Sequence, residues 1–501
     1  MRSYWLDTSP TITPTNTGFI SRDRYDVVVA GAGLTGLTTA VLLARAGKRV
    51  AVLEARSVGA VATGNTTAKL SLLQGSVLSG IREHQADDIL RAYVEANREG
   101  QAWLLRHLDE HKVSYQRRDA FTYATTEDGV ATLRRELEAC QTAGLDAQWA
   151  DATELPFEVA GAIRMPDQAQ FHPMPVLQTL ANELIDRDGE LIEGVRVTGA
   201  DHHRSLTVQT SAGDVEADHL VLATGVPVLD RGGHFATLSA HRSYALTFRL
   251  PEGSSPVQGM YLSVDSPDRT LRSVPAADGS ELLLIGGNDH SVGRATSHSG
   301  AVADLETWAR EHFPGAERTH AWSAQDYRSI HQLPLLGTLP HSEGTVFFAT
   351  GFNKWGMTNG VAAALAITSQ IHGHSPSWAE ALSERVTSAA DVATGFKDNL
   401  STGMHMATGW ASAELTSLPH DAPAERQGVV GQRHGRPLGV STVEGTTCAV
   451  SAICPHMGGI LRWNDAEHTW DCPLHASRFA PDGTRLEGPA LHDLSRPHDE
   501  E

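Results

Sequence analysis

The sequence predicts a two-part protein: an α/β domain built on a parallel sheet, followed by a small all-β domain at the C-terminal end. A glycine-rich turn lies between two apolar strands near the N-terminus, an order typical of nucleotide-binding α/β units. Two Cys-His pairs lie close together near the C-terminus, among short alternating segments and glycine turns. The chain has 501 residues, which indicates two or three domains rather than a single core.

Composition narrows the class of protein. Hydrophobic residues make up 41% of the chain and charged residues 20%, as in a soluble globular enzyme. The formal net charge of −20 makes nucleic acid and anionic membrane surfaces poor partners. No run of 18 apolar residues occurs, so we expect no membrane span, and residues 1–24 lack the apolar core of a signal peptide. Because the chain has only four cysteines, a reducing cytoplasm is the simplest location.

The segment Tyr25–Ala55 has the pattern of a dinucleotide site. Gly31 permits a tight turn, Gly33 lets the backbone approach a pyrophosphate, and Gly36 lets the helix pack closely on the strand. The helix N-terminus offers N–H groups to phosphate, and Glu54 lies where a carboxylate can accept hydrogen bonds from a ribose. The expected elements are a strand at Tyr25–Ala30, a helix at Leu34–Ala46 and a strand at Arg49–Leu53.

Two later segments favour FAD over NAD. "ADHLVLATGVPV" (Ala217–Val228) is a strand ending in Ala-Thr-Gly, although an ordinary strand with a glycine turn would read the same. The segment Val346–Ile371 reads as a strand, a glycine-rich turn and a long helix, whose N-terminus could face an anionic flavin ring. No second G-x-G-x-x-G occurs, so no separate NAD(P)H site is expected.

These segments, with "GNTTAKLSLLQG" and "WSAQDYRSIHQLPLLGTLP", resemble the D-amino-acid oxidase and glycine oxidase family of FAD-dependent oxidoreductases. The resemblance covers roughly Tyr25 to Gly373. It implies a Rossmann-like FAD domain with an inserted α+β substrate domain, and oxidation of a C–N bond of an amine or amino acid. The FAD-binding residues it implies are Gly31, Gly33, Leu34, Thr35, Gly36, Glu54, Ala55, Thr66, Thr67, Ala68, Thr224, Gly225, Gly351, Gly356, Met357 and Thr358.

Catalytic residues are harder to assign. The arginine that pairs with a substrate carboxylate in this family has no motif here, and Arg242, Arg294 and Arg328 are candidates. Lys69 and Lys354 stand out because a lysine near the flavin can position water or dioxygen. For each candidate taken singly, a structural role is the alternative. The predicted catalytic set is Lys69, His172, Arg242, Tyr244, Lys354 and Trp355, and His331 is a further candidate.

The C-terminal pairs read Cys454-x-His456, 15 intervening residues, then Cys472-x-x-His475. Zinc fingers group the cysteines first and the histidines second, whereas here each loop carries one thiolate and one imidazole. Two such loops can give two thiolates to one iron and two imidazoles to another, which is the ligation of a Rieske [2Fe–2S] centre. A zinc site and four unrelated polar residues are the alternatives.

The flanking segment Val429–Leu494 resembles a Rieske domain along its length. High-potential members carry a disulfide between the loops, and Gly459 and Leu474 stand at those places. Ser477 can keep a hydrogen bond to the cluster sulfurs, but Phe479 has no hydroxyl to donate. The resemblance therefore implies a potential at the low end of the Rieske span, on the order of −150 mV.

The expected organisation has four parts. They are an N-terminal extension at 1–24, the oxidoreductase at 25–372 with substrate segments at about 73–150 and 239–321, a helical linker at 373–416, and the Rieske domain at 417–501. The linker includes a weakly periodic helix at about Ala389–Trp410. A packed linker would fix the cluster against the flavin, and a flexible one would let it swing.

Two functions of different classes follow. The first is a cytoplasmic enzyme that oxidises a C–N bond, with electrons passing from FAD to the cluster and on to an external one-electron acceptor. The second is an electron-transfer protein that serves a partner enzyme, in which electrons could also enter through the cluster. A flavin-dependent tailoring step in a specialised pathway is a third possibility. A shielded pocket over the flavin would favour the first, and an exposed flavin or cluster face the second.

Overall fold

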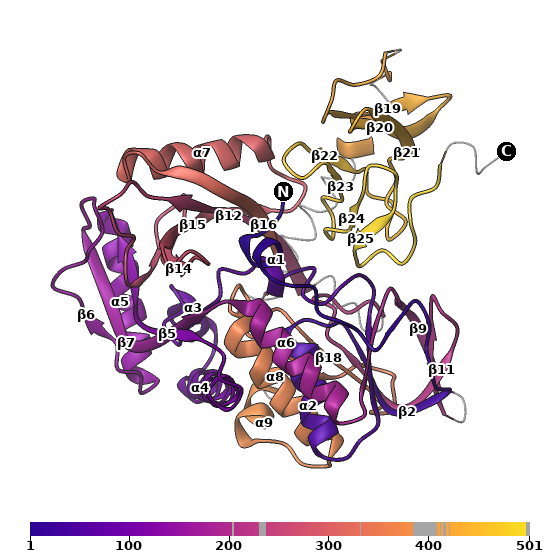
Figure 1. Ribbon diagram of the computed structural model, residues 1–501, viewed down its shortest axis with the longest axis horizontal. Helices are drawn as coiled ribbons and strands as arrows, with labels where there is room; N and C mark the ends of the chain where they lie inside the picture. The colour runs from indigo at the N-terminus through magenta and orange to yellow at the C-terminus, as the bar shows by residue number, and fades with distance from the viewer. Residues whose placement is uncertain are drawn as a thin grey trace.

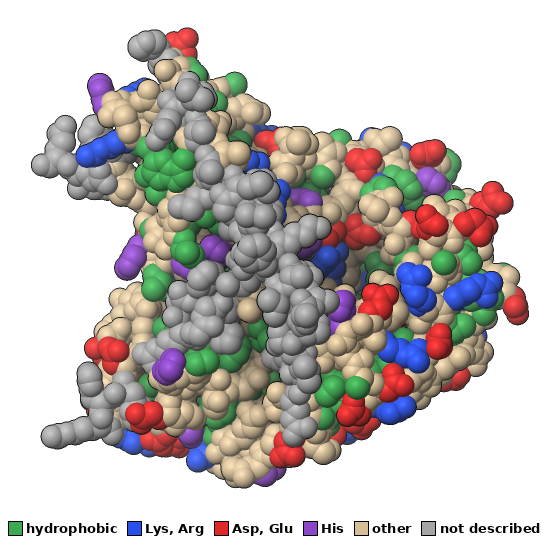
Figure 2. Space-filling model, turned by 180° about the vertical axis from the view of Figure 1, so that it is seen from behind, with side chains coloured by type: hydrophobic (Ala, Val, Ile, Leu, Met, Phe, Trp, Pro, Cys, Tyr) green, Lys and Arg blue, Asp and Glu red, His purple; other side chains and the backbone are tan. Residues whose placement is uncertain are grey.

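The computed structural model describes residues 1–202, 205–229, 237–330, 332–383, 408–410, 412–413, 417–419 and 421–496. The predicted helix at Ala389–Trp410 lies outside the described residues except for 408–410. Two large sheets form the body of the molecule, and two small sheets form the C-terminal domain (Figure 1). On the face shown in Figure 2, acidic and basic side chains are interspersed rather than gathered by sign.

The first sheet has a parallel centre, in the order β1-β8-β3-β2-β11, with β18 beside the end of β11. An antiparallel pair, β10 and β9, extends it, and β17 pairs with β18. The strands are β1 (Asn16–Thr17), β2 (Arg24–Ala30), β3 (Val50–Glu54), β8 (Glu190–Glu193), β9 (Val197–His202), β10 (Leu206–Thr210), β11 (Val215–Leu222), β17 (Leu335–Thr338) and β18 (Val346–Thr350).

Both faces of this sheet are buried, which explains why its strands are apolar runs. Val27 and Val29 pack into one hydrophobic cluster, and Val28 and Ala30 into another on the opposite face. Three helices, α2, α6 and α8, pack together on one side, as Figure 1 shows. They are α2 (Leu34–Arg45), α6 (Pro173–Asp186) and α8 (Gly356–Ile371). The predicted strand-turn-helix-strand unit is confirmed.

The second sheet is mostly antiparallel, in the order β16-β12-β15-β14-β13-β5-β7-β4, with β6 on β7. Helix α7 covers one part of it, and α3, α4 and α5 build a separate apolar cluster with β5, β7 and β13. Its strands are β4 (Lys69–Leu70), β5 (Tyr115–Ala124), β6 (Gln148–Trp149), β7 (Gly161–Phe171), β12 (Leu238–Arg249), β13 (Met260–Ser263), β14 (Arg269–Pro275), β15 (Glu281–Ser291) and β16 (Glu317–Ser329). The helices are α3 (Val77–His84), α4 (Asp87–Glu110), α5 (Glu127–Thr142) and α7 (His298–His312).

The second sheet extends beyond the expected substrate segments, because β7 pairs with β5 along its whole length and β16 with β12. Residues 1–24 also contribute to the body. They form α1 (Tyr4–Thr8) and β1, and Trp5 is fully buried with its indole nitrogen donating to the Thr66 carbonyl at 2.6 Å. In the expected linker, α9 (Ser377–Ser383) buries Trp378 against α4.

The C-terminal domain has two antiparallel sheets. They contain β19 (Gly428–Arg433), β20 (Arg436–Val443) and β21 (Thr446–Ser451), then β22 (Arg462–Asn464), β23 (Thr469–Asp471), β24 (Arg478–Phe479) and β25 (Arg485–Glu487). Trp470 and Phe479 are fully buried and form its small core with the two cysteines of the Cys-His pairs. Among the described residues, no helix combines the length and apolar character that crossing a bilayer requires.

A buried carboxylate joins the helices that cover the first sheet, and we expect its loss to destabilise the protein. Glu183 on α6 accepts two hydrogen bonds from Arg45 of α2, at 2.7 and 2.8 Å, and one from Arg187. Burial opposes ionisation, but these arginines hold the pKa of Glu183 at about 2. Glu183→Gln should therefore cost about 2 kcal/mol near pH 7.

The pH dependence supplies the check. A lowered carboxyl pKa contributes stability above the unfolded value of about 4.3 and loses it as the pH falls towards the folded value. The difference in unfolding temperature between wild type and Glu183→Gln should therefore shrink below about pH 4. Glu110→Gln, whose exposed carboxylate is 3.9 Å from Arg45, should change little at any pH. An equal effect of the two changes would contradict the assignment.

Candidate functional site

The glycine-rich turn has the geometry that a dinucleotide needs. Gly31 has φ of +106°, and a Cβ there would lie 2.5 Å from the Ala223 carbonyl oxygen. A Cβ on Gly36 would lie 2.0 Å from the Gly31 carbonyl oxygen, so the helix and the turn touch through backbone. Gly33 is the N-cap of α2 and has no side chain to cap it. The Leu34 N–H donates to the Thr63 hydroxyl at 3.1 Å, and the next N–H groups of the first turn can receive a phosphate.

Glu54 closes β3 and faces the same turn. Its carboxylate accepts hydrogen bonds from the Ala32 N–H at 2.9 Å and the Arg56 N–H at 2.8 Å. Burial raises the pKa of this carboxyl group above its ordinary value. Because each carboxylate oxygen can accept two hydrogen bonds, Glu54 can still receive a ribose hydroxyl. These residues fit the ADP half of FAD.

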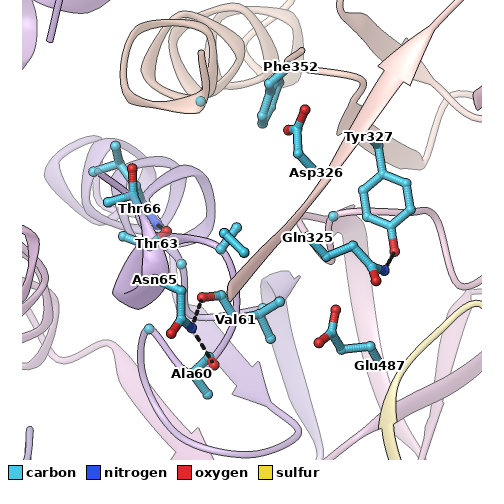
Figure 3. Close-up of a pocket in the computed structure, with 18 of the residues that line it drawn as sticks. Ala60, Val61, Thr63, Asn65, Thr66, Gln325, Asp326, Tyr327, Phe352 and Glu487 are labelled. Atoms are coloured by element: carbon cyan, nitrogen blue, oxygen red, sulfur yellow. Dashed lines mark hydrogen bonds between the residues drawn. The ribbon is translucent and has the colours of Figure 1, made fainter. Parts of the chain in front are cut away.

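A pocket with a cavity volume of about 340 Å³ runs from this turn towards the second sheet. Figure 3 shows residues from several elements facing it, including Thr63, Asn65, Gln325 and Glu487. A second helix N-terminus, that of α8, also reaches the pocket and has no side-chain cap. The predicted cofactor residues that line it are Gly31, Gly33, Leu34, Thr35, Glu54, Ala55, Thr66, Thr67, Thr224, Gly225, Gly351, Gly356 and Met357.

Three predicted cofactor residues do not line the pocket. Gly36 acts through the close packing described above. Ala68 is fully buried with φ of +53°, and its carbonyl accepts a hydrogen bond from Arg272 at 2.7 Å. Thr358 is also fully buried, and its hydroxyl donates to Asn97 of α4 because α8 packs on α4 at this point.

Lys69 is the most unusual group on the pocket wall. Its side chain is buried, and its amine donates hydrogen bonds to the Tyr261 carbonyl, at 2.7 Å, and to the Thr270 hydroxyl. Neither partner is a carboxylate. Burial, and then the nearby Arg272, lower the pKa of this amine well below its ordinary value. When this amine is neutral and donates both N–H groups, its lone pair can accept a proton from the pocket.

Lys354 is held differently, by carboxylates. The turn before α8 places it at φ of +68°, where its N–H donates to Asp326 at 2.7 Å. Its amine forms ion pairs with Asp268 at 3.3 Å and Asp289 at 3.0 Å. Burial raises the pKa of Asp326 to about 6, against the opposing effects of Arg328 and Lys354. The pocket wall therefore carries two carboxyl groups, Asp268 and Asp326, beside Lys354.

Tyr244 and Trp355 line the pocket as well, and both are buried. The Tyr244 hydroxyl is 2.7 Å from Nδ1 of His298, so this end of the ring is bound within the second sheet and its helix. Trp355 is the N-cap residue of α8. Lys69, Tyr244, Lys354 and Trp355 are thus the predicted catalytic residues that the structure brings together.

His172 lies away from the pocket. It is the N-cap of α6, where Nδ1 accepts the Met174 N–H at 3.3 Å, and its ring packs edge-on against Trp5. Burial, and then Arg272, lower its pKa to about 4. His172 therefore has a structural role as a helix cap, because its acceptor nitrogen is used by the Met174 N–H.

Arg242 also lies outside the pocket. It is fully buried on β12, donates to Ser323 at 2.7 Å and Gln325 at 2.8 Å, and faces Glu467 and Asp471 of the C-terminal domain. Its guanidinium is therefore not available to a substrate carboxylate. The two other arginine candidates give no substitute: Arg328 pairs with Asp289 at 2.8 Å, and Arg294 is not on the pocket wall. His331 lies outside the described residues.

The two Cys-His loops of the C-terminal domain repeat one backbone pattern. The Cys454 N–H donates to the carbonyl five residues later, at 2.9 Å, and its own carbonyl accepts from the Gly458 N–H four residues later. Cys472 makes the same two bonds, the second with Ala476. Gly458 and Ala476 both have positive φ, at +71° and +65°. The loops therefore present their ligands in matching geometry.

The ligand side chains converge. Both cysteines are buried and lie in hydrogen-bond contact, which lowers the pKa of Cys454 below its ordinary value, with a further contribution from Ser477. The rings of His456 and His475 lie 4.9 Å apart between centroids and are nearly perpendicular. Paired thiols beside paired imidazoles fit a Rieske cluster, which takes two thiolates on one iron and two imidazoles on the other.

The spacing also argues against zinc. Metal–ligand bonds of about 2.0–2.3 Å keep the ligands of one tetrahedral ion within about 4.6 Å of one another. Among the described residues, only His107, His111 and Glu183 bring three such atoms within 4.8 Å, and Arg45 and Arg187 already occupy Glu183. The Cys and His ligand atoms of the two C-terminal loops form no such group of three.

The positions of the missing inter-loop disulfide lie face to face. A Cβ on Gly459 would be 2.7 Å from the Leu474 side chain and 3.0 Å from the Cys472 sulfur. All four cysteines of the chain are free. Phe479 is fully buried and packs in the domain core. The low redox potential remains a prediction.

Sequence reasoning missed several residues on the pocket wall. Gln325 and Asp326 stand within the segment quoted for the family resemblance, but strand alternation could have indicated only one of these two neighbours. Asp268 had no signal of its own. Glu487 comes from the C-terminal domain, so no pattern in the first domain could have indicated it.

The fold and the site define a flavin-dependent oxidoreductase that carries its own iron–sulfur domain. Residues 26–370 match the family model of FAD dependent oxidoreductases (DAO), and the chain belongs to this family. Residues 416–497 match the model of the Rieske [2Fe-2S] domain. The cofactors are therefore FAD and a Rieske-type [2Fe–2S] cluster, as the sequence predicted.

Known relatives share this architecture in whole or in part. YhfW of Bacillus subtilis (strain 168), named as a Rieske 2Fe-2S iron-sulfur protein, is 29% identical over 99% of this chain and 97% of its own length. Gamma-glutamylputrescine oxidoreductase of Escherichia coli (strain K12) is 27% identical over 40% of this chain and 48% of its own. The structure of glycine oxidase from Geobacillus kaustophilus superposes with a TM-score of 0.60 at 20% identity, covering 71% of this chain and 96% of that one.

Proposed function

We propose that the protein is a dehydrogenase that oxidises the C–N bond of an amine, with electrons leaving through the Rieske cluster to an external one-electron carrier. The observation that carries this proposal is a pocket whose wall holds the buried Lys69, which has no carboxylate partner, and the carboxyl groups of Asp268 and Asp326 beside Lys354. FAD supplies a two-electron acceptor for a hydride from the carbon next to nitrogen, and the cluster supplies a one-electron exit. Because all four cysteines are free, a reducing cytoplasm suits the chain.

The wall of the pocket favours an amine over an amino acid. Asp268 is already paired with Lys354, so Asp326 is the carboxyl group on this wall that can attract an ammonium group, whereas Arg242 and Arg328 are engaged with carboxylates of the protein itself. The relative named gamma-glutamylputrescine oxidoreductase supports the same substrate class. The broader substrate class that the family suggests includes amino acids as well as amines.

An ammonium must lose a proton before a hydride can leave its carbon. The lone pair of Lys69 is suited to accept that proton, or to hold the water that does so. Burial of Lys69, Tyr244 and Trp355 excludes bulk water from this part of the pocket. The C-terminal domain contributes Glu487 to the same wall, so the domain that holds the cluster lies beside the flavin site. Electrons therefore have a route to the cluster and need not pass to dioxygen.

An anaerobic panel tests the substrate class. The purified protein is mixed with primary, secondary and polyamines, with D- and L-amino acids, and separately with NADH and NADPH, and the flavin absorbance is followed. We expect bleaching with one or more amines and none with the nicotinamides. Reduction by NAD(P)H alone, or only by a protein donor, would contradict this proposal and support the electron-transfer alternative.

Removing the lysine should slow flavin reduction. Lys69→Met should lower the rate with the best amine by about 10²–10³-fold at unchanged FAD content. In wild type the rate should rise with pH through the lowered pKa of Lys69, because only the neutral amine accepts a proton. Stopped-flow absorbance measures both effects.

The exposed Lys112 provides the matched control. Lys112→Met should reduce flavin at the wild-type rate with the same pH profile. A Lys69→Met protein that keeps both the rate and the rising pH limb would exclude Lys69 from proton transfer.

A further inference from the structure

A buried network of charges joins the C-terminal domain to the second sheet. Arg242 of β12 is fully buried and lies 3.6 Å from Glu467 and 3.9 Å from Asp471. Arg478 of β24, itself in the C-terminal domain, pairs with the same two carboxylates and with Glu487 at 2.8 Å. Separating the domains would break the ion pairs of Arg242 with Glu467 and Asp471. Any of these charges that stayed buried without its partner would carry a high desolvation free energy.

A second contact caps a helix across the boundary. Asp465, in the turn between β22 and β23, accepts the N–H groups of His298 at 2.9 Å and Ser299 at 3.1 Å, at the first turn of α7. It also accepts a hydrogen bond from the Ser299 hydroxyl. A carboxylate at a helix N-terminus satisfies free donors and complements the helix dipole. The C-terminal domain therefore completes an element of the oxidoreductase domain.

A third contact lies at the cluster loop itself. A Cβ on Gly293, in the segment after β15, would be 2.7 Å from the Pro473 Cα. Pro473 stands between the ligands Cys472 and His475. The backbones of the two domains thus touch beside the cluster, at a distance that no larger residue than glycine would allow.

Gln325 connects this loop to the flavin pocket. Its amide nitrogen donates to the Ala476 carbonyl at 3.2 Å and to the Tyr327 hydroxyl at 2.8 Å, and its amide oxygen accepts from Arg242. Ala476 directly follows the ligand His475. Figure 3 shows Gln325, Tyr327 and Glu487 beside the same cavity, which all three line.

We propose that the Rieske domain is permanently docked as a wall of the flavin pocket, and that Arg242 and Gln325 are the positioning residues that hold its cluster loop there. Electrons then cross one at a time along Gln325, Ala476 and His475 without movement of the domain, and a one-electron carrier protein reoxidises the cluster after each transfer. The docking does not depend on the proposed function. Only the direction of electron flow, from flavin to cluster, rests on that function.

The test supplies electrons without a substrate, so it does not depend on the amine assignment. The flavin of the anaerobic holoprotein is photoreduced by a laser flash with EDTA present as the sacrificial electron donor, and the rate of cluster reduction is followed with and without added sucrose. A docked domain gives a rate that does not depend on viscosity. A rate that falls in proportion to viscosity would show a swinging domain and overturn the proposal.

Two variants locate the contacts. Gln325→Met keeps the side-chain size but removes the bond to Ala476, and should slow cluster reduction by about tenfold with both cofactors present in full. Arg242→Gln should increase hydrogen exchange of the amides at 465–478 and 298–299. Arg249→Gln, an exposed arginine on the same strand, is the control and should change neither.

The two variants test the electron route and the domain contact separately. A wild-type rate in Gln325→Met would exclude the proposed route, and unchanged exchange in folded Arg242→Gln would exclude the clamp. If Arg242→Gln does not fold, the viscosity result and Gln325→Met still test the proposal.

Discussion

Replacing Cys454 with serine is expected to remove the [2Fe–2S] cluster and leave FAD in place. Cys454 is buried in contact with Cys472, and these two residues supply the thiolates that the loops offer to one iron. The oxygen of serine is a poor replacement for a soft thiolate. Bound iron and the low-temperature EPR signal of the reduced cluster should fall to about a tenth or less.

Cys448 provides a matched control on the same domain. It lies on β21, partly exposed and paired with Ser441 of β20, and belongs to neither Cys-His loop, so Cys448→Ser should keep iron, EPR signal and FAD at wild-type levels. Iron and labile sulfide analysis, with flavin absorbance, measures all three. A full Rieske signal in Cys454→Ser, or loss of the signal in Cys448→Ser, would contradict the ligand assignment.

A single methyl group at Gly36 is expected to weaken FAD binding strongly. Its Cβ would lie 2.0 Å from the Gly31 carbonyl oxygen, so the turn that receives the pyrophosphate must move. Alanine is otherwise favoured over glycine within a helix by about 1 kcal/mol, so any loss reports the steric clash. We expect FAD affinity to fall by about 100-fold or more, because the turn is displaced by more than about 1 Å.

Gly47 supplies the comparison, since it follows the end of the same helix at φ of +79°, and a Cβ there would have no other atom within 4 Å. Gly47→Asn should bind FAD normally, because asparagine tolerates this conformation. Fluorescence titration of the apoprotein with FAD gives the affinities. The cluster EPR signal, which should persist in Gly36→Ala, shows that the chain has folded. Normal FAD affinity in Gly36→Ala would contradict the assigned role of this turn.

The sequence predicted those parts of the site that short segments build on their own. Gly31, Gly33 and Glu54 act within one strand-turn-helix-strand unit, so their spacing already carried the geometry. The two Cys-His loops are equally local, because each closes through backbone bonds within five residues. For such motifs, residue type and spacing nearly determine the chemistry.

Long-range contacts were beyond the same reasoning. Arg242 is one of three arginine candidates for a substrate carboxylate in the sequence, but its partners are Glu467 and Asp471, more than 200 residues away. Glu487 reaches the pocket only because the C-terminal domain docks there. A single sequence shows which residues can form an ion pair, but the fold decides which of them meet.

The question of a fixed or swinging cluster was left open by the sequence for the same reason. The linker composition does not decide it, whereas the domain interface does. Asp465, Pro473 and Ala476 each contact the oxidoreductase domain directly, and these contacts lie on both sides of the ligand Cys472. The contacts between the two domains hold the cluster loop in place, so the linker is not needed for this.

One measurement tests the central claim that a substrate pocket and a Rieske cluster work in series in this chain. The anaerobic protein is mixed with the best amine, its flavin absorbance is followed, and samples are frozen at intervals for EPR. We predict that the flavin bleaches first and the reduced-cluster signal follows, while Cys454→Ser shows the bleaching alone. A cluster signal that precedes flavin bleaching, or a flavin that stays reduced beside an oxidised cluster in wild type, would contradict it.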